Sequence, residues 1–210
     1  MSQKNNSLEI LKDFVVRYEA DESAPVVQGV FKEGVGRDKN ILYSPSFQVT
    51  KEHQPYLESF LSLMLRTMIA ESGIGIASCQ VGVPLQAFII GMENDEGSER
   101  YLEVEKVPYQ VFINPRIIKA SKQYRSFWHG CLSAKGQKLG RVATYDWVEC
   151  EAYTLDFKKF RVKLEGMASI IFQHEFRHLL GKLYIDQTHK MKYLYISYLL
   201  ILLLFLDSII

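Results

Sequence analysis

Apolar residues recur every three to four positions between residues 54 and 72, the spacing that places them on one face of a helix. Pro55 stands near the start, where a missing N–H is harmless, and Gly73 follows the stretch. The pattern therefore predicts an amphipathic helix over 54–72 whose apolar face belongs to the core. The positions on this face are Leu57, Phe60, Leu61, Met64, Leu65, Met68 and Ile69.

Residues 73–165 have a pattern typical of β-structure. Short apolar runs at 88–90 and 111–113 are each followed by residues that interrupt regular structure. These are Gly91 after the first run and Asn114-Pro115 after the second. We therefore expect short strands that end at these residues.

A hairpin and a second helix complete the predicted domain. Residues 148–155 and 160–164 flank a short polar stretch, as two strands joined by a turn do. Gly166 then precedes an apolar helix predicted at 167–180, which Gly181 ends. Strands followed by an apolar helix predict an α+β domain with that helix buried against a sheet.

The two ends of the chain differ from this middle part. Residues 1–40 are polar and contain one short predicted helix, at 8–17. The stretch 193–206 is almost continuously apolar, but as a helix it spans only ~21 Å, less than the ~30 Å hydrocarbon core of a bilayer. Three interpretations of this stretch stay open: a packed helix, a marginal membrane anchor, and a cloning or reading-frame artefact. We expect an extension over 1–40, a domain over 41–188 and an apolar tail over 189–210.

Composition narrows the class of protein. The 210 residues carry 25 Lys and Arg against 24 Asp and Glu, and a net charge of +1 gives no direct sign of nucleic-acid binding. An apolar share of 48% excludes a disordered or many-pass membrane chain. Three cysteines indicate a reducing compartment rather than a disulfide framework. The first residues resemble neither a secretion signal nor a transit peptide, so we expect a cytoplasmic protein.

The strongest local signal is a pair of histidines on the second predicted helix. His174 and His178 are four residues apart and therefore lie on the same helix face, where both imidazoles can bind one cation. Glu175 lies beside them, where its carboxylate can take a proton from water. The rest of the helix is apolar, which disfavours a merely solvated face. The pattern predicts a hydrolytic metal site.

Such a site needs a third protein ligand and an open position. His189 follows His178 by eleven residues, and Cys131 lies upstream between Gly130 and Leu132. A lone cysteine is usually a small buried apolar residue. Whether Cys131 is the third ligand therefore depends on the residues around it.

Three segments of the chain together resemble the peptide deformylases. Their family motifs are G-x-G-x-A-A-x-Q, E-G-C-x-S and Q-H-E-x-D-H-x-x-G. The matching segments occur here in the same order, and the resemblance covers roughly 41–186. They are Gly73–Gln80, Gly130–Ser133 and Gln173–Gly181, with support from 81–84, 112–115 and 164–166.

The resemblance implies a fold and a role for each matched residue. The fold would be α+β, with antiparallel β-sheets packed around a buried metal-binding helix. Cys131, His174 and His178 would bind one divalent ion, Fe²⁺ in the first place and otherwise Zn²⁺, Ni²⁺ or Co²⁺. Glu175 would be the acid–base group. The side chain of Gln80 and the N–H of Leu132 would stabilise the oxyanion. The expected substrate-binding residues are Gly73, Ile74, Gly75, His129, Met167, Ile170 and Ile171.

Two acidic residues of these motifs are absent. His129 replaces the Glu before Gly-Cys, Arg177 replaces the Asp of the helix motif, and Thr144 stands where the family often has Arg. Residues that surround metal ligands orient them and tune the ion. We therefore expect that His129 and Arg177 are part of a rebuilt charge network in a working hydrolase. His129 either competes for the ion or replaces the Glu as a hydrogen-bond partner.

The expected function is removal of the formyl group from formylmethionine at the start of new peptides. The main alternative is a weak or inactive relative that keeps the ion and binds peptides. An unrelated zinc endopeptidase, which leaves Cys131 and Gln80 unexplained, and activity on another acyl substrate are the remaining alternatives. The expected partners are N-formylmethionyl peptides, with proximity to ribosomes and membrane contact through 193–206 as further options.

Overall fold

The computed structural model describes residues 3–19, 25, 27–28, 40–92, 106–135 and 139–187. The apolar stretch at 193–206 and the tail predicted over 189–210 lie outside these residues. Within the described ranges, no helix is both long enough and apolar enough to cross a bilayer.

Three helices and seven strands make up the fold. The helices are α1 (Gln3–Glu19), α2 (Gln54–Ala70) and α3 (Gly166–Leu179). The strands are β1 (Gly75–Ala77), β2 (Ala87–Met92), β3 (Val107–Ala120), β4 (Tyr124–His129), β5 (Gly140–Tyr145), β6 (Trp147–Tyr153) and β7 (Lys159–Glu165). Short 3₁₀ turns lie at η2 (Ile41–Tyr43), η3 (Lys51–His53), η4 (Ser78–Val81) and η5 (Leu132–Ala134).

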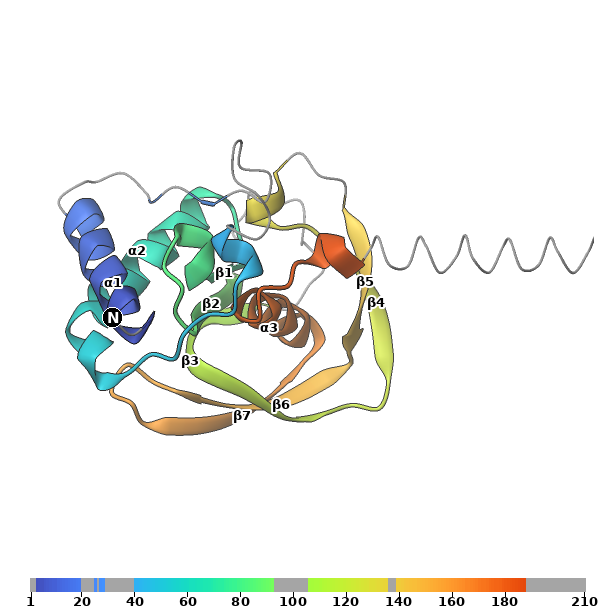
Figure 1. Ribbon diagram of the computed structural model, residues 1–210. Coiled ribbons are helices and arrows are strands. Elements are labelled where there is room, and N and C mark those ends of the chain that lie inside the picture. The colour runs from blue at the N-terminus through green and yellow to red at the C-terminus, as the bar shows by residue number, and fades with distance from the viewer. Residues whose placement is uncertain are drawn as a thin grey trace, which may run out of the picture.

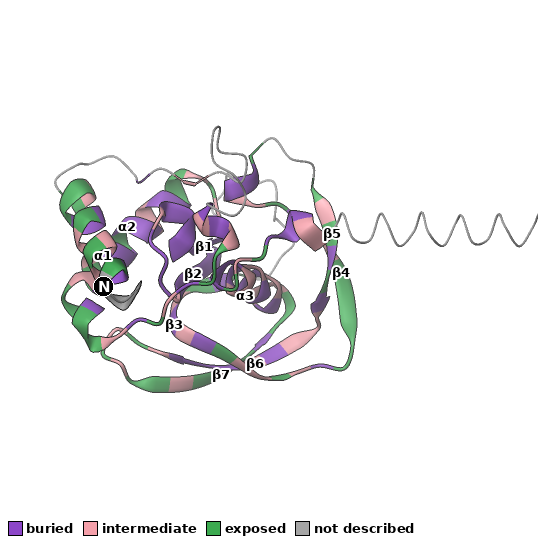
Figure 2. Ribbon diagram, in the orientation of Figure 1, coloured by how far each residue is buried: buried purple, intermediate pink, exposed green. Residues whose placement is uncertain are grey.

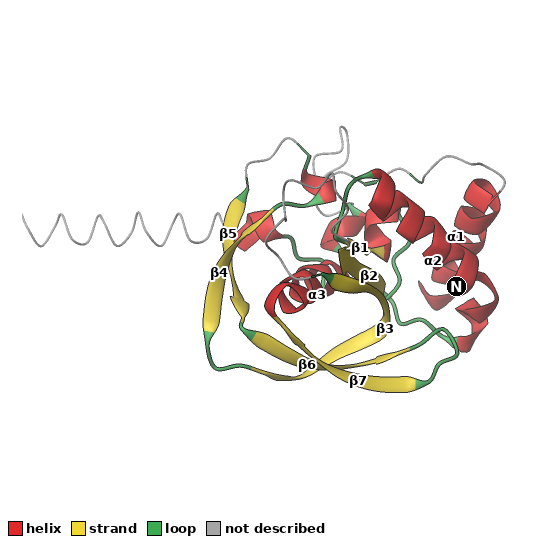
Figure 3. Ribbon diagram, turned by 180° about the vertical axis from the view of Figure 1, so that it is seen from behind, coloured by secondary structure: helices red, strands yellow, loops and turns green. Residues whose placement is uncertain are grey.

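The strands form two antiparallel sheets. One has the order β1-β2-β3-β6-β7, and the other is the pair β4-β5. Both curve around α3, which lies in the middle of the molecule, with α1 and α2 to one side (Figures 1 and 3). The expected α+β class with antiparallel sheets is confirmed. The predicted hairpin is the pair β6-β7.

The expectation that strands end at Gly91 and at Asn114-Pro115 was wrong. Strand β2 continues through Gly91, and β3 continues through Asn114 and Pro115 to Ala120. The pairing register shifts at both places, between Ile90 and Met92 and between Ile113 and Arg116. A bulge leaves a residue outside the ladder, so a proline without an N–H is tolerated there. Asn114 has φ +47° and binds the backbone N–H and C=O of Val49 instead, at 2.8 Å each.

Helix α3 is held by an aromatic cluster at the centre of the sheet. The ring of Phe172 meets Phe88 and Phe112 nearly edge-on, with centroids 5.2 and 5.0 Å away. All three side chains are fully buried, and Figure 2 shows that most of α3 is buried or half-buried. The predicted stop at Gly181 is present: its φ is +66°, and an added Cβ would lie 2.7 Å from the Tyr43 backbone. The cluster therefore fixes the helix that carries both histidines.

Helices α2 and α1 form a second core. Most of the predicted apolar face of α2 is buried, including Leu57, Phe60 and Met64. The expectation was wrong for Ile69, which lies in the last turn and is 56% exposed, and Leu65 is half-buried. The helix ends two residues earlier than expected. Helix α1 is longer than the predicted 8–17 because its own apolar face packs on α2. The rings of Phe14 and Phe60 lie 5.3 Å apart.

His53 connects the start of α2 to α1. From its contacts we predict that the free energy of unfolding depends on pH. Its Nδ1 accepts the backbone N–H of Thr50 at 3.0 Å, and its Nε2 lies 3.3 Å from the Ser7 hydroxyl. Burial lowers the pKa of His53. The unfolded chain therefore takes up a proton first, so the free energy of unfolding should fall as the pH drops below about 6.5.

Urea unfolding of the protein and of His53→Asn from pH 8 to pH 5 tests this prediction. The Asn side-chain oxygen can accept the same N–H but does not titrate, so the variant should lose less stability on acidification. Equal losses in both proteins would contradict the assignment to His53.

Candidate metal centre

The structure brings Cys131, His174 and His178 together. The two histidines lie one turn apart on α3, and Cys131 lies between β4 and η5. One donor atom from each residue lies within 4.8 Å of the other two. The Cys131 sulfur is 3.3 Å from Nε2 of His178. This arrangement suits a single ion between the three donors.

Of the three donor residues, His178 is buried and Cys131 and His174 are partly buried, and the loss of solvent around them controls their protonation. Burial, and to a lesser extent the Glu175 carboxylate, raises the pKa of the Cys131 thiol to about 12. Burial lowers the pKa of His178 to about 4 and that of His174 below its usual value. Imidazoles that stay neutral keep a lone pair for a cation, and a bound cation favours the thiolate. The residues therefore fit a divalent metal ion.

Glu175 is buried beside these donors, and one of its two carboxylate oxygens has no hydrogen-bond partner among the described residues. Its side chain is 3% exposed, and its Oε2 meets no partner among the described residues. Burial raises the pKa of this carboxyl well above its usual value. A buried carboxylate without a partner is costly for the fold. Such a group is a candidate for acid–base chemistry on a ligand that enters the site.

Gly75 leaves the space that Glu175 occupies. A Cβ on Gly75 would lie 2.5 Å from Oε1 of Glu175 and 2.8 Å from the Ile171 side chain. The sequence analysis expected a different role for Gly75, namely substrate binding. Glu175 can therefore place its carboxylate here only because residue 75 has no side chain.

The side chain of Gln80 is fixed with its amide nitrogen toward Cys131. Its Oε1 accepts the backbone N–H of Ala77 at 2.8 Å. Its Nε2 donates to Ser133 at 3.2 Å and lies 3.6 Å from the Cys131 sulfur. Leu132, which follows Cys131 directly, opens η5. The predicted oxyanion donors therefore lie next to a predicted ligand.

Among the residues predicted to bind substrate, Gly73 lies beside Leu132, and Gly75 lies beside Glu175 and Ile171. Gly73 and Ile74 lead into β1, the edge strand of the larger sheet. Met167 and Ile170 on α3 are half-buried, whereas Ile171 is buried.

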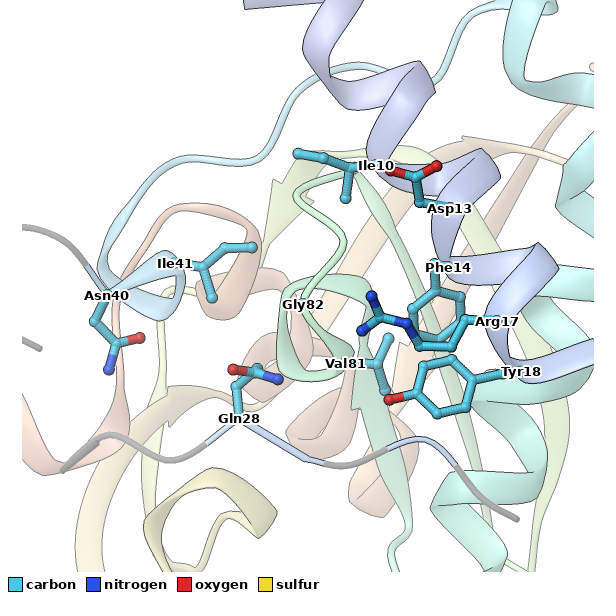
Figure 4. Close-up of a pocket in the computed structure, with 10 residues that line it drawn as sticks. All are labelled: Ile10, Asp13, Phe14, Arg17, Tyr18, Gln28, Asn40, Ile41, Val81 and Gly82. Atoms are coloured by element: carbon cyan, nitrogen blue, oxygen red, sulfur yellow. The ribbon is translucent and has the colours of Figure 1, made fainter. Parts of the chain in front are cut away.

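A cavity of about 440 Å³ lies elsewhere, between α1 and η4. It is lined by Asp13 and Arg17 among others (Figure 4). None of its lining residues is a predicted site residue, so the methionine pocket expected at Met167, Ile170 and Ile171 stays a prediction.

His129 and Arg177 surround the ligands in place of the two acids. His129 is 4% exposed, and its Nδ1 lies 3.1 Å from Nδ1 of His174. Burial, together with Arg177, lowers the pKa of His129 to about 4. The guanidinium of Arg177 donates to the carbonyl of Ala143 at 3.1 Å and to Oε1 of Gln187 at 2.7 Å. Arg177 thus binds α3 to β5 and to the segment that follows α3.

Restoring an acid with Arg177→Asp should harm the protein. The substitution removes both hydrogen bonds and places a carboxylate near the Ala143 carbonyl. Hydrogen bonds from charged donors contribute about 1.5–3 kcal/mol each. Two are lost, so the free energy of unfolding should fall by about 3–6 kcal/mol, and formate release should fall too. Urea unfolding and a formate assay measure both, with Arg177→Lys as the charge-matched control. A gain in activity would contradict the rebuilt network.

Gln173 has a role that sequence reasoning missed. Its Oε1 accepts the N–H of Tyr145 at 2.8 Å, and its Nε2 donates to the carbonyl of Tyr145 at 2.9 Å and to Ser169. This pair of bonds joins α3 to the end of β5 next to His174. The signal was present, because an amide inside an apolar helix needs buried partners.

Comparisons with known proteins agree with this geometry. The family model for polypeptide deformylases matches residues 35–193. Peptide deformylase 1 of Nitrosomonas europaea is 36% identical over 143 residues, which cover 68% of this chain and 79% of that protein. Peptide deformylase 2 of Pseudomonas syringae pv. tomato is 35% identical over 128 residues, 61% of this chain and 69% of that protein.

Solved structures are similar as well. The Met-Ala-Ser-bound class I type b peptide deformylase of Acinetobacter baumannii superposes with a TM-score of 0.69 and 25% identity, over 78% of this chain and 98% of that one. The peptide deformylase of Thermotoga maritima gives a TM-score of 0.64 at 24% identity, over 79% and 97% of the two chains.

Proposed function

The chain belongs to the peptide deformylase family and removes the formyl group from amino-terminal methionine, and we propose that Cys131, His174, His178 and Glu175 form its reacting centre. One observation carries this proposal. Three donors that suit a divalent ion, with His178 buried and Cys131 and His174 partly buried, lie beside the buried Glu175, whose Oε2 has no partner in the described part of the chain.

The metal would be held by the Cys131 sulfur and by one nitrogen each of His174 and His178. We propose Fe²⁺ as the native ion, with Zn²⁺, Ni²⁺ or Co²⁺ able to occupy the same donors, because a thiolate and two imidazoles accept any of them. When bound, the ion polarises the attacking water and makes its deprotonation possible near neutral pH.

Glu175 would move the protons of the hydrolysis. It accepts a proton from the attacking water as the oxygen bonds to the formyl carbon, and it returns a proton to the methionine nitrogen as the C–N bond breaks. Formate and a free amine leave, and the carboxylate is regenerated. The Nε2 of Gln80 and the backbone N–H of Leu132 would donate to the formyl oxygen as it becomes negative.

The peptide would lie along the edge of the larger sheet. Strand β1 has β2 on one side and is the outermost strand of the described sheet. An extended peptide can therefore pair with the backbone of Gly73–Gly75 as an additional strand. Met167, Ile170 and Ile171 on α3 would receive the methionine side chain, with His129 at the edge of the site.

The alternatives fit the structure less well. A protein that only binds peptides has no need of a buried carboxylate whose Oε2 lacks a partner in the described part of the chain, because such a group destabilises the fold. A zinc endopeptidase would leave the positions of Gln80 and Cys131 without explanation. His189, the other candidate for a third ligand, lies outside the described residues.

A comparison of substrates tests the proposed function. Full-length protein is loaded with Fe²⁺ under anaerobic conditions. It should release formate from formyl-Met-Ala-Ser, and it should leave both acetyl-Met-Ala-Ser and an unmodified peptide intact. Chelation should abolish the release, and Fe²⁺ should restore it. Cleavage of an internal peptide bond, or release of acetate at a similar rate, would support one of the alternatives instead.

The substrates would be chains that leave the ribosome, and we propose a cytoplasmic site of action near it. The support is chemical, because formylmethionine exists only where ribosomes start chains with it. Co-sedimentation of the protein with translating ribosomes tests this placement.

A further inference from the structure

We propose that His129 is a positioning residue that holds His174 in the tautomer able to bind the ion. This inference rests on the proposed role of His174 as a ligand. His129 is the last residue of β4 and lies two residues before Cys131. The same short segment therefore supplies one candidate ligand and the group that orients another.

The two imidazoles meet edge to edge. Their Nδ1 atoms are 3.1 Å apart, and the planes of the rings differ by only 15°. The ring centroids are 5.4 Å apart, which exceeds the distance between the nitrogens by about two ring radii. Stacked rings would not give this relation. The contact has the direction of an N–H···N hydrogen bond.

The chemistry of the ligand fixes the direction of this bond. His174 uses Nδ1 for His129, so Nε2 is the nitrogen left for the ion. A neutral imidazole that binds through Nε2 carries its hydrogen on Nδ1. His174 therefore donates, and Nδ1 of His129 accepts. The reverse direction would put the hydrogen of His174 on the nitrogen that has to bind the ion.

The other histidine has no such support in the described part of the chain. Nδ1 of His178 is buried there without a partner, although its Nε2 lies at the Cys131 sulfur. Of the two Nδ1 atoms of the candidate histidine ligands, only that of His174 has a hydrogen-bond partner within the described ranges, and this partner is His129. In the family motif this position is a Glu, whose side chain carries a negative charge. Here an uncharged side chain accepts, next to Arg177.

Three substitutions separate the hydrogen bond from the packing. The side-chain oxygen of Asn lies where Nδ1 of histidine lies, so His129→Asn keeps an acceptor in place. His129→Gln moves the oxygen one bond further out, and His129→Leu has no acceptor. Each full-length variant is titrated with Co²⁺, and the dissociation constant, the visible spectrum of the bound Co²⁺ and formate release are measured.

We expect His129→Leu to lose ~10–100-fold in Co²⁺ affinity and to change the spectrum, since partners that orient ligands have effects of this size. His129→Asn should stay close to the unsubstituted protein in Co²⁺ affinity and in the Co²⁺ spectrum, and His129→Gln should resemble His129→Leu in both. If His129→Leu does not fold, the difference in Co²⁺ affinity and spectrum between His129→Asn and His129→Gln tests the inference by itself.

Unchanged affinity and spectrum in His129→Leu, or equal damage from Asn and Gln, would overturn the inference. Loss of a nitrogen ligand from the Co²⁺ spectrum of His129→Asn would overturn it too, because His129 would then be a ligand. Unsubstituted protein that binds one Co²⁺ but releases no formate would contradict the proposed function only. The ranking of Co²⁺ affinities would still decide on His129.

Discussion

Glu175→Gln should reduce formate release by ~10²–10⁴-fold, the usual contribution of a general acid–base group, and leave the bound ion in place. Gln has the shape of Glu but cannot take a proton from water. The carboxylate is buried without a partner in the described part of the chain, so its removal leaves no hydrogen-bond partner behind. The rate of formate release at saturating formyl-Met-Ala-Ser measures the effect.

The metal content of the same preparation is the control. Glu175→Gln should retain one ion per chain and unfold at the same temperature or higher, because a buried ionisable group has been replaced by a neutral one. A variant that keeps its ion and most of its activity would contradict the role of Glu175.

Gly75→Ala should cost ~10²-fold in formate release, although alanine is the smallest side chain that could be added. The new Cβ would lie 2.5 Å from Oε1 of Glu175, so the carboxylate has to move. A misplacement of about 1 Å in a reacting group commonly costs ~10²-fold in rate. Formate release and metal content are measured as for Glu175→Gln.

A double variant shows whether Gly75 acts through Glu175. If it does, adding Gly75→Ala to Glu175→Gln should have little further effect, since residues that act as a unit are not additive. A further ~10²-fold loss in the double variant would show that Gly75 contributes separately, for example to peptide binding.

The elements with strong local signals were predictable from the sequence. Helix α2 has a clear 3.6-residue period with Pro55 at its start, and α3 carries two histidines four residues apart before Gly181. The hairpin β6-β7 followed from two apolar runs around a polar turn. These signals depend on neighbours in the sequence, which a pattern records directly.

Features that depend on distant residues were not predictable. The bulge at Asn114 exists because its side chain binds Val49, 65 residues away. The extent of α1 depends on its packing against Phe60. The contact between His129 and His174 joins residues 45 positions apart, and the sequence left two roles for His129 open. The space over Gly75 is defined by the Glu175 side chain, which no local pattern contains.

The central claim is that one ion at Cys131, His174 and His178 makes this chain a working deformylase despite His129 and Arg177. The most direct test is an anaerobic titration of the metal-free full-length protein with Fe²⁺, with formate release from formyl-Met-Ala-Ser followed at each addition. The account predicts that the rate rises linearly and stops rising at one Fe²⁺ per chain. A folded protein that binds one Fe²⁺ and releases no formate would contradict it.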